Sequence, residues 1–180
     1  MLLPGAVFHP TENRDERPAD TPIDLLVIHS ISLPPGEFGG PWIDNFFLNR
    51  LDPGAHPFFA TIQDLRVSSH LLIRRDGEIV QYVPFDQRAW HAGQSNFCGH
   101  WRCNDFSIGI ELEGSDLEPF SASQYSVLTQ ATHWLMQRYP AIRETRITSH
   151  SAISPGRKTD PGPHFDWRHY RTLLQAARKT

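Results

Sequence analysis

One short apolar run constrains the fold of this chain more than any other segment. The residues Leu25-Leu26-Val27-Ile28 are continuously apolar rather than alternating, and the run ends at His29. Continuous runs of this length, here within a predicted strand from Asp24 to Ser30, are typical of strands that are buried on both faces of a sheet. The run therefore predicts a buried strand that presents a histidine at its end.

The rest of the chain predicts further strands and helices around this one. Residues 106–113 alternate between apolar and polar or small side chains, as a strand with one apolar face does. The pair Asp76-Gly77 separates two apolar runs and is a strong hairpin signal. Further elements are predicted as a helix at 42–51, a helix from Ser121 to about Tyr139, a strand at 147–150 and a helix capped by Asp166 that runs to Ala177. Without repeats or linkers, the pattern predicts a single mixed α/β (α+β) domain over residues 1–180, with its core at about 20–175.

Composition and charge exclude several classes of protein. The length of 180 residues allows one well-packed domain. A net charge of −3 argues against a nucleic-acid partner, which would need a basic surface. No run approaches the ~18 apolar residues of a membrane helix, and the N-terminal segment is too short and broken for a signal peptide. We therefore expect a cytoplasmic protein without a membrane partner, in which Cys98 and Cys103 are free thiols, although a disulfide between them is geometrically possible.

His29, His150 and Asp160 are the candidate metal ligands. Each histidine ends an apolar strand, a rigid position that can hold a ligand, and the proline after Asp160 favours an extended conformation that aims its carboxylate. Taken alone, each histidine would more often lie in the core, and the aspartate would more often cap a helix or a turn. Together, two imidazoles and one carboxylate suit Zn²⁺ and leave a fourth position open for water, which predicts a hydrolytic site.

Two glutamates and a lysine extend this candidate site. Glu111 and Glu113 are two residues apart on one predicted strand, so both point to the same face. They are either solvated carboxylates, a general base beside a metal, or the acid and base of a glycosidase. Lys158 lies two residues before Asp160 in an extended loop, where it is either solvated or a cation that stabilises negative charge on a carbonyl oxygen. His70, inside a strand pattern, is interpreted either as a structural residue or as a second contact behind the metal ligands.

Several segments, taken in order, resemble a known family. They are residues 29–40 (HSISLPPGEFGG), 69–77 (SHLLIRRDG), 89–93 (AWHAG), 103–114 (CNDFSIGIELEG) and 157–163 (RKTDPGP). Together they resemble the zinc-dependent N-acetylmuramoyl-L-alanine amidases, a family that includes phage T7 lysozyme and peptidoglycan recognition proteins. Within it, they are most similar to the branch that acts on 1,6-anhydro-N-acetylmuramoyl peptides. The resemblance runs from about residue 20 to 170, and several segments in order are more specific than any single motif.

This resemblance carries expectations about the fold and the site. It implies a central mixed β-sheet flanked by helices. The Zn²⁺ ligands that it implies are His29, His150 and Asp160. It assigns the activation of water at the metal to Glu111 rather than Glu113, and it places Lys158 near the scissile carbonyl. It also places Arg66, Trp90 and Arg102 in segments that line the substrate groove, where arginine can grip the carboxylates of a peptide.

The implied reaction is hydrolysis of the amide between N-acetyl-anhydromuramic acid and the L-alanine of the stem peptide, as occurs in cell-wall recycling, with an anhydro-muropeptide as the small-molecule partner. The alternatives are a broader peptidoglycan amidase that accepts non-anhydro muropeptides and a non-catalytic peptidoglycan-binding module. Loss of a zinc ligand would mark the second alternative, and none is lost. The sequence departs from the family at two places: Ser30 replaces a common asparagine in the sugar-binding segment, and Phe58 replaces a common tyrosine whose hydroxyl could donate a proton.

Overall fold

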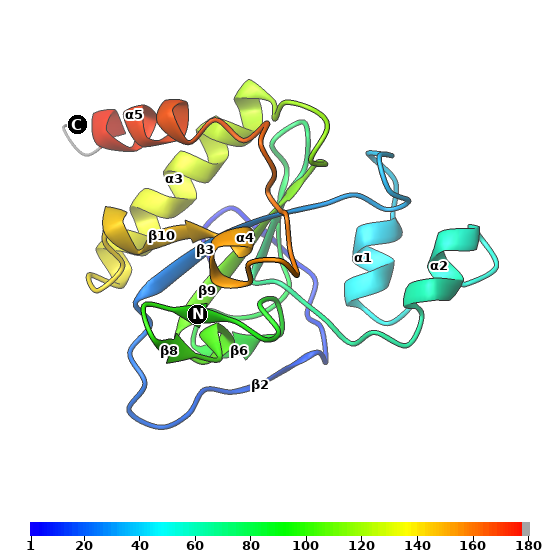
Figure 1. The fold of residues 1–180 in the computed structure, drawn as a ribbon, viewed down its shortest axis with the longest axis horizontal. Coiled ribbons are helices and arrows are strands. Elements are labelled where there is room, and N and C mark those ends of the chain that lie inside the picture. Colours follow the sequence, from blue (N-terminus) through cyan, green and yellow to red (C-terminus); the bar gives the residue numbers. More distant parts are fainter. Residues whose placement is uncertain (178–180) are drawn as a thin grey trace.

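The predicted buried strand is β3 (Leu25–Ile31), and it lies inside a six-stranded mixed sheet with the order β1-β5-β4-β9-β3-β10 (Figure 1). The structure, a computed structural model, describes residues 1–177. The other strands of this sheet are β1 (Val7–Phe8), β4 (Leu71–Ile73), β5 (Ile79–Gln81), β9 (Ser107–Glu113) and β10 (Ile147–Ser149). β3 pairs in parallel with β9 on one side and with β10 on the other. The carboxyl ends of these three strands therefore lie at the same edge of the sheet.

Two helices, α3 (Ala122–Arg138) and α5 (Trp167–Ala177), cover one face of β3 and β9 (Figure 1). The alternation of β9 sends Ile108, Ile110 and Leu112 into this layer, as the sequence pattern predicts. Both predicted helix starts are confirmed. Ser121 forms a capping box with the side chain of Gln124, and the Asp166 carboxylate accepts a hydrogen bond of 2.8 Å from the backbone N–H three residues later.

A second apolar cluster packs on the other face of the sheet, where β4 and β5 form the predicted hairpin. It is covered by α1 (Trp42–Phe47) and α2 (Pro57–Ile62), which stand apart from the other helices in Figure 1. α1 is shorter than predicted, because the chain turns at Asn49, which has a left-handed φ of 58°. α2 was not predicted. Its first turn is held by His56, whose Nδ1 accepts a hydrogen bond of 3.1 Å from the N–H of Phe58.

Short elements complete the domain. β2 (Arg14–Glu16) pairs with β6 (Gln87–Ala89), and β7 (Asn96–Phe97) pairs with β8 (His100–Trp101). The remaining elements are the 3₁₀ turns η1 (Cys103–Asp105) and η2 (Glu144–Arg146) and the short helix α4 (His150–Ile153). Among the described residues, no helix is both long enough and apolar enough to span a membrane. The predicted single α/β domain with a central mixed sheet and flanking helices is confirmed.

Candidate metal centre and groove

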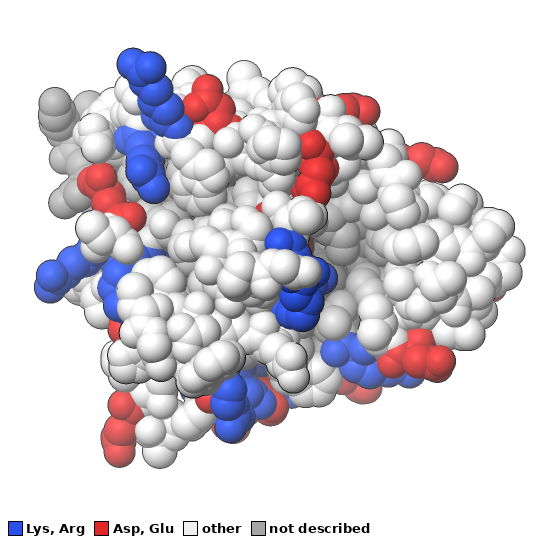
Figure 2. All heavy atoms as spheres, in the orientation of Figure 1, with Lys and Arg blue, Asp and Glu red and all other residues white. Residues whose placement is uncertain are grey.

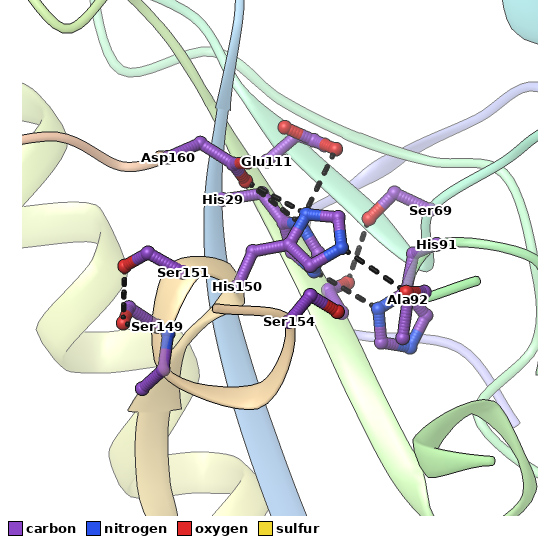
Figure 3. A network of polar contacts seen from close by, with 12 residues as sticks. His29, Ser69, His91, Ala92, Glu111, Ser149, His150, Ser151, Ser154 and Asp160 are labelled. Atoms are coloured by element: carbon purple, nitrogen blue, oxygen red, sulfur yellow. Dashed lines mark hydrogen bonds and ion pairs between the residues drawn. The ribbon is translucent and has the colours of Figure 1, made fainter. Parts of the chain in front are cut away.

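The three predicted metal ligands come together on the face of β3 that points away from α3 and α5 (Figure 3). His29 lies near the end of β3, and His150 follows directly after β10, the strand beside it. Asp160 lies in the loop after α4, where its carbonyl accepts a hydrogen bond of 3.0 Å from the N–H of Ser151. Because β3 and β10 are parallel neighbours, the sheet brings two residues that are far apart in the sequence to one edge.

The donor atoms of these three residues form a compact triangle. The distance from His29 Nδ1 to His150 Nδ1 is 2.9 Å, and Asp160 Oδ2 lies 3.1 Å from the first nitrogen and 3.0 Å from the second. Zinc bonded tetrahedrally at 2.0–2.1 Å would hold such donors roughly 3.3 Å apart. A single proton can satisfy only one of the three pairs, whereas one cation satisfies all three. The residues therefore fit a small divalent metal ion.

The environment holds His29 and Asp160 in the protonation states that bind metal. Burial lowers the pKa of His29 to about 4, and the hydrogen bond with Asp160 only partly opposes this shift. Burial by itself would raise the pKa of Asp160, but hydrogen bonds from His150 and His29 outweigh it and hold that pKa below its usual range. At neutral pH the site thus offers a neutral imidazole and an ionised carboxylate, which are the ligand forms.

Glu111 lies beside this cluster and has a free oxygen. In the register of the sheet it is the direct neighbour of His29, and its Oε1 lies 3.8 Å from His29 Nδ1. Its Oε2 is buried and has no hydrogen-bond partner. Burial raises the pKa of Glu111 well above its usual value, the charge of Asp160 adds to that rise, and the charge of Lys158 opposes it. A buried carboxyl with an unused oxygen beside a cation site is a candidate general base.

Glu113 lies on the same face of β9, but both of its carboxylate oxygens have hydrogen-bond partners. Its Oε1 accepts a hydrogen bond of 2.7 Å from the N–H of Gly39, and its Oε2 accepts one of 3.1 Å from the N–H of Arg75. The side chain is buried, these two backbone groups are its hydrogen-bond partners, and the Arg74 guanidinium lies 3.8 Å from its Oε1 as an ion-pair partner. Glu113 ties two loops to the end of the sheet, and the pair of free carboxylates that a glycosidase needs is not present here.

Two cavities meet at the metal cluster and share Ser30, Lys158 and Asp160 in their walls. The smaller, of about 190 Å³, is apolar on one side; its lining includes Phe46, Phe47, Leu65, Val67 and Trp90. The larger, of about 480 Å³, is polar; its lining includes Ser32, Ser115, Asp116, Arg157 and Thr159. Figure 2 shows a hollow between the body of the domain and the lobe formed by α1 and α2, with basic side chains at its edge. Together the cavities form a groove with a polar half and an apolar half.

The structure separates the predicted substrate-binding residues into two groups. Ser30 and Trp90 line the groove, whereas Arg66 and Arg102 are not among the described residues that line either cavity. The Arg66 guanidinium donates to nearby backbone carbonyls, and Arg102 forms an ion pair of 3.3 Å with Asp105. Phe58 packs on the apolar cluster of α1 and α2. Lys158 is exposed in the wall beside the metal cluster.

Sequence reasoning missed the residues behind the metal ligands. His91 Nδ1 lies 2.9 Å from His29 Nε2, and the carbonyl oxygen of Ala92 lies 3.1 Å from His150 Nε2 (Figure 3). His70, for which a contact behind the ligands was one interpretation, instead has its Nε2 3.0 Å from the Arg17 guanidinium and 3.1 Å from a backbone carbonyl. The only sequence signal for His91 was its place in the AWHAG segment, because an irregular loop has no periodicity to indicate where its side chains point.

Comparisons with known proteins find relatives over most of this chain. Residues 19–163 match the family described as N-acetylmuramoyl-L-alanine amidase. The chain is 61% identical over 165 residues to the 1,6-anhydro-N-acetylmuramyl-L-alanine amidase AmpD of Salmonella typhimurium strain LT2, covering 92% of this chain and 88% of the relative. It is 59% identical over 172 residues to AmpD of Escherichia coli K12, covering 96% and 93%.

Solved structures have the same fold. A crystal structure of a selenomethionine derivative of AmpD superposes with a TM-score of 0.94 at 59% identity, covering 96% of each chain. The E. coli amidase AmiD, solved in complex with anhydro-N-acetylmuramic acid-L-Ala-D-γ-Glu-L-Lys as substrate, superposes with a TM-score of 0.63 at 32% identity, covering 88% of this chain and 60% of that one.

Proposed function

The chain belongs to the N-acetylmuramoyl-L-alanine amidase family, and from this membership and the geometry of the site we infer which bond it cuts and which residues cut it. It is an amide hydrolase that acts on anhydro-muropeptides, and the bond is the amide between N-acetyl-anhydromuramic acid and L-alanine. The observation that carries this inference is the position of the unpartnered Glu111 oxygen beside three converging metal ligands, in the groove.

Zn²⁺ is the metal that we propose for the His29, His150 and Asp160 cluster. Two neutral imidazoles and one carboxylate are a common donor set for catalytic zinc, which keeps a fourth position open. When bound, zinc supplies Lewis acidity, which lowers the pKa of a coordinated water and polarises an amide carbonyl. The protein contributes the preformed triangle of donor atoms, which is buried on the sheet side and open to the groove on the other.

Glu111 is the residue that we propose moves the proton. Its raised pKa and its unpartnered oxygen suit a base that takes a proton from the attacking water and passes it to the nitrogen of the leaving L-alanine. Lys158, in the wall of both cavities, lies where its ammonium can stabilise the negative charge that develops on the carbonyl oxygen. Ser30 and Trp90 line the same groove and are proposed to contact the substrate; Arg66 and Arg102 would reach it only by changing their present partners.

The relatives of this chain support the proposal that the sugar of the substrate is the anhydro form. Relatives at 59–61% identity over most of this chain are described as 1,6-anhydro-N-acetylmuramyl-L-alanine amidases. A bicyclic sugar is compact and rigid, so a groove shaped for it gains orientation at little cost in conformational entropy. We place the reaction in the cytoplasm and treat residues 1–180 as one amidase domain. Cys98 and Cys103 are both free thiols, the state that a reducing compartment maintains.

A pair of matched substrates tests this function. The same stem peptide is supplied on 1,6-anhydro-N-acetylmuramic acid and on reducing N-acetylmuramic acid, and the products are followed by mass and by rate. We expect release of a peptide with a free L-alanine amine, with kcat/KM at least about tenfold higher for the anhydro substrate, equal to ~1.4 kcal/mol of transition-state binding. Equal rates would contradict the anhydro preference and support the broader amidase. Absence of hydrolysis on both substrates would leave only a binding module.

A further inference from the structure

The two metal-binding imidazoles are each held from behind by consecutive residues of one loop. His29 presents Nδ1 to the metal cluster and Nε2 to His91 Nδ1, at 2.9 Å. The two rings meet edge to face, with centroids 5.0 Å apart and an interplanar angle of 90° (Figure 3). A metal on Nδ1 leaves the proton of the neutral His29 ring on Nε2. His29 must therefore donate to His91, whose Nδ1 is the acceptor.

This hydrogen bond requires a His91 tautomer without a proton on Nδ1. The contact that His91 makes through Nε2 sets that tautomer. His91 Nε2 lies 3.0 Å from the hydroxyl oxygen of Ser107, in the first residue of β9. With its proton on Nε2, His91 donates to Ser107 and keeps the lone pair of Nδ1 for His29. The result is a directed chain from the metal cluster through two imidazoles to a buried hydroxyl. Both His91 and Ser107 are buried, so water does not compete for these hydrogen bonds.

Strand β9 leaves room for the His91 ring at one position. A Cβ at Gly109 would lie 2.5 Å from His91 Cγ and 2.6 Å from its Nδ1, too close for any side chain. Gly109 lies in the middle of a central strand, where glycine weakens the sheet and often marks a close approach by another group. Here the close approach is made by the His91 imidazole, which lies against the strand two residues before Glu111, the neighbour of His29 in the sheet.

The residue after His91 holds the other imidazole. The carbonyl oxygen of Ala92 lies 3.1 Å from His150 Nε2, so it accepts the proton that a metal on Nδ1 leaves there. The backbone of this pair is fixed in turn: the amide oxygen of Asn104 accepts hydrogen bonds of 3.1 Å and 2.8 Å from the N–H groups of His91 and Ala92. The guanidinium of Arg157 donates to the Ala92 carbonyl at 2.6 Å.

We propose that the pair His91–Ala92 positions both metal-binding imidazoles, His91 through its side chain and Ala92 through its carbonyl, and that His91 sets the metal affinity of the site without touching the metal. The inference rests on the metal site proposed above. Partners behind a ligand fix its ring orientation and raise its basicity, and their loss typically weakens metal binding roughly 10–100-fold. A neutral acceptor adds no negative charge to that of Asp160 and Glu111.

Zinc affinity tests this assignment directly. The dissociation constant is measured by competition with a chelator at fixed pH, for the wild-type chain and for His91→Phe and His91→Gln. Phenylalanine keeps a ring but removes the acceptor, so we expect zinc to bind roughly 10–100-fold more weakly. The glutamine side chain carries an acceptor oxygen, so His91→Gln should recover most of the affinity.

A matched control separates positioning from simple loss of packing. His70 is also buried, its ring centroid lies 5.8 Å from that of His91, and within the described part of the chain its hydrogen bonds reach Arg17, Gln87 and Gly109 rather than a metal ligand. His70→Gln should lower the Tm of the metal-free protein yet keep the zinc dissociation constant within about threefold of wild type, less than ~0.7 kcal/mol. The positioning role would be overturned if His91→Phe binds zinc as tightly as wild type, or if His70→Gln loses as much affinity as His91→Phe.

If His91→Phe does not fold, two further measurements test whether His91 positions the metal-binding imidazole of His29. Ser107→Ala removes the group that fixes the His91 tautomer and should weaken zinc binding relative to the wild-type chain; an unchanged dissociation constant would overturn the role of this hydrogen-bond chain. Nitrogen NMR of the zinc-loaded wild type should find His91 protonated on Nε2 and bare on Nδ1; a proton on Nδ1 would overturn the inference. Failure of the wild-type chain to bind zinc would instead refute the metal assignment itself.

Discussion

The two carboxylates at the end of β9 lie two residues apart, point to the same side of the sheet and are both buried, yet their surroundings differ. Around Glu113, backbone N–H groups of two loops satisfy both oxygens. Around Glu111, one oxygen faces the metal cluster and the other has no partner. Most buried polar groups in proteins are paired, and an exception calls for an explanation. We conclude that Glu111, the carboxylate with an unpaired oxygen, is available for chemistry, while Glu113, whose oxygens are both paired, holds the loops beside it.

The same difference accounts for the electrostatics of the site. A buried carboxylate without a partner is costly, and it either takes up a proton or requires a nearby cation. Burial and the charge of Asp160 raise the pKa of Glu111 well above its usual value, and the charge of Lys158 opposes this rise. A divalent ion at the His29, His150 and Asp160 cluster would favour its ionised form, the form that a general base needs.

The largest effect is expected when Glu111 and Glu113 are each replaced by glutamine, which tests the comparison between them. Glu111→Gln should keep its zinc and lose turnover on the order of 10²–10⁴-fold, the range for one general base, because the amide preserves shape but cannot take the proton. Glu113→Gln should keep turnover within a few-fold but lower the free energy of unfolding by about 1–3 kcal/mol, because it weakens two buried hydrogen bonds to the loops. Zinc content, kcat and Tm are measured for both. Equal losses of turnover would point back to a catalytic carboxylate pair.

Lys158 sharpens the comparison, because it is the cation next to Glu111 in the groove. Lys158→Ala should lower kcat more than it raises KM, since an ammonium that stabilises developing charge acts mainly in the transition state. Lys158→Arg keeps the charge and serves as the control that should recover part of the rate. A variant that changes only KM would show that Lys158 binds the substrate in its ground state.

Phe58 has the smallest expected effect, because it packs in the lobe of α1 and α2 and is not among the described residues that line the groove. Phe58→Tyr restores the hydroxyl common in the family, and we expect turnover to stay unchanged because zinc and Lys158 already supply positive charge at the oxyanion. Steady-state kinetics on one anhydro-muropeptide measures this. A gain of tenfold or more, worth ~1.4 kcal/mol of barrier, would show that the missing hydroxyl limits the rate.

Local signals explain what could be predicted of the fold from the sequence. The apolar run of β3 and the caps at Ser121 and Asp166 each act within a few residues, and the structure confirms all three. The pairing of β2 with β6 joins two short, mostly polar segments about 70 residues apart, so no apolar pattern in the sequence indicates this pairing. The helix α2 is six residues long and has too few turns to produce a period.

The candidate site likewise has residues that the sequence could predict and residues that it could not. The metal trio was predictable because His29 and His150 lie at or near the ends of strands and Asp160 directly precedes a proline, positions that fix the direction of each side chain. The anchoring of Glu113 was not, since its hydrogen-bond partners are backbone N–H groups, which every residue but proline carries. His91 was missed because its role depends on a contact across 62 residues of chain and on the space left by Gly109.

Stepwise addition of zinc to the metal-free protein tests the central claim most directly. The release of peptide from an anhydro-muropeptide is followed as zinc is added to protein that has been freed of metal by a chelator. Activity should rise in proportion to added zinc and level off at about one equivalent per chain, and His29→Ala, His150→Ala and Asp160→Ala should neither retain zinc nor regain activity. Full turnover by the metal-free chain, or by any of the three variants, would contradict the account.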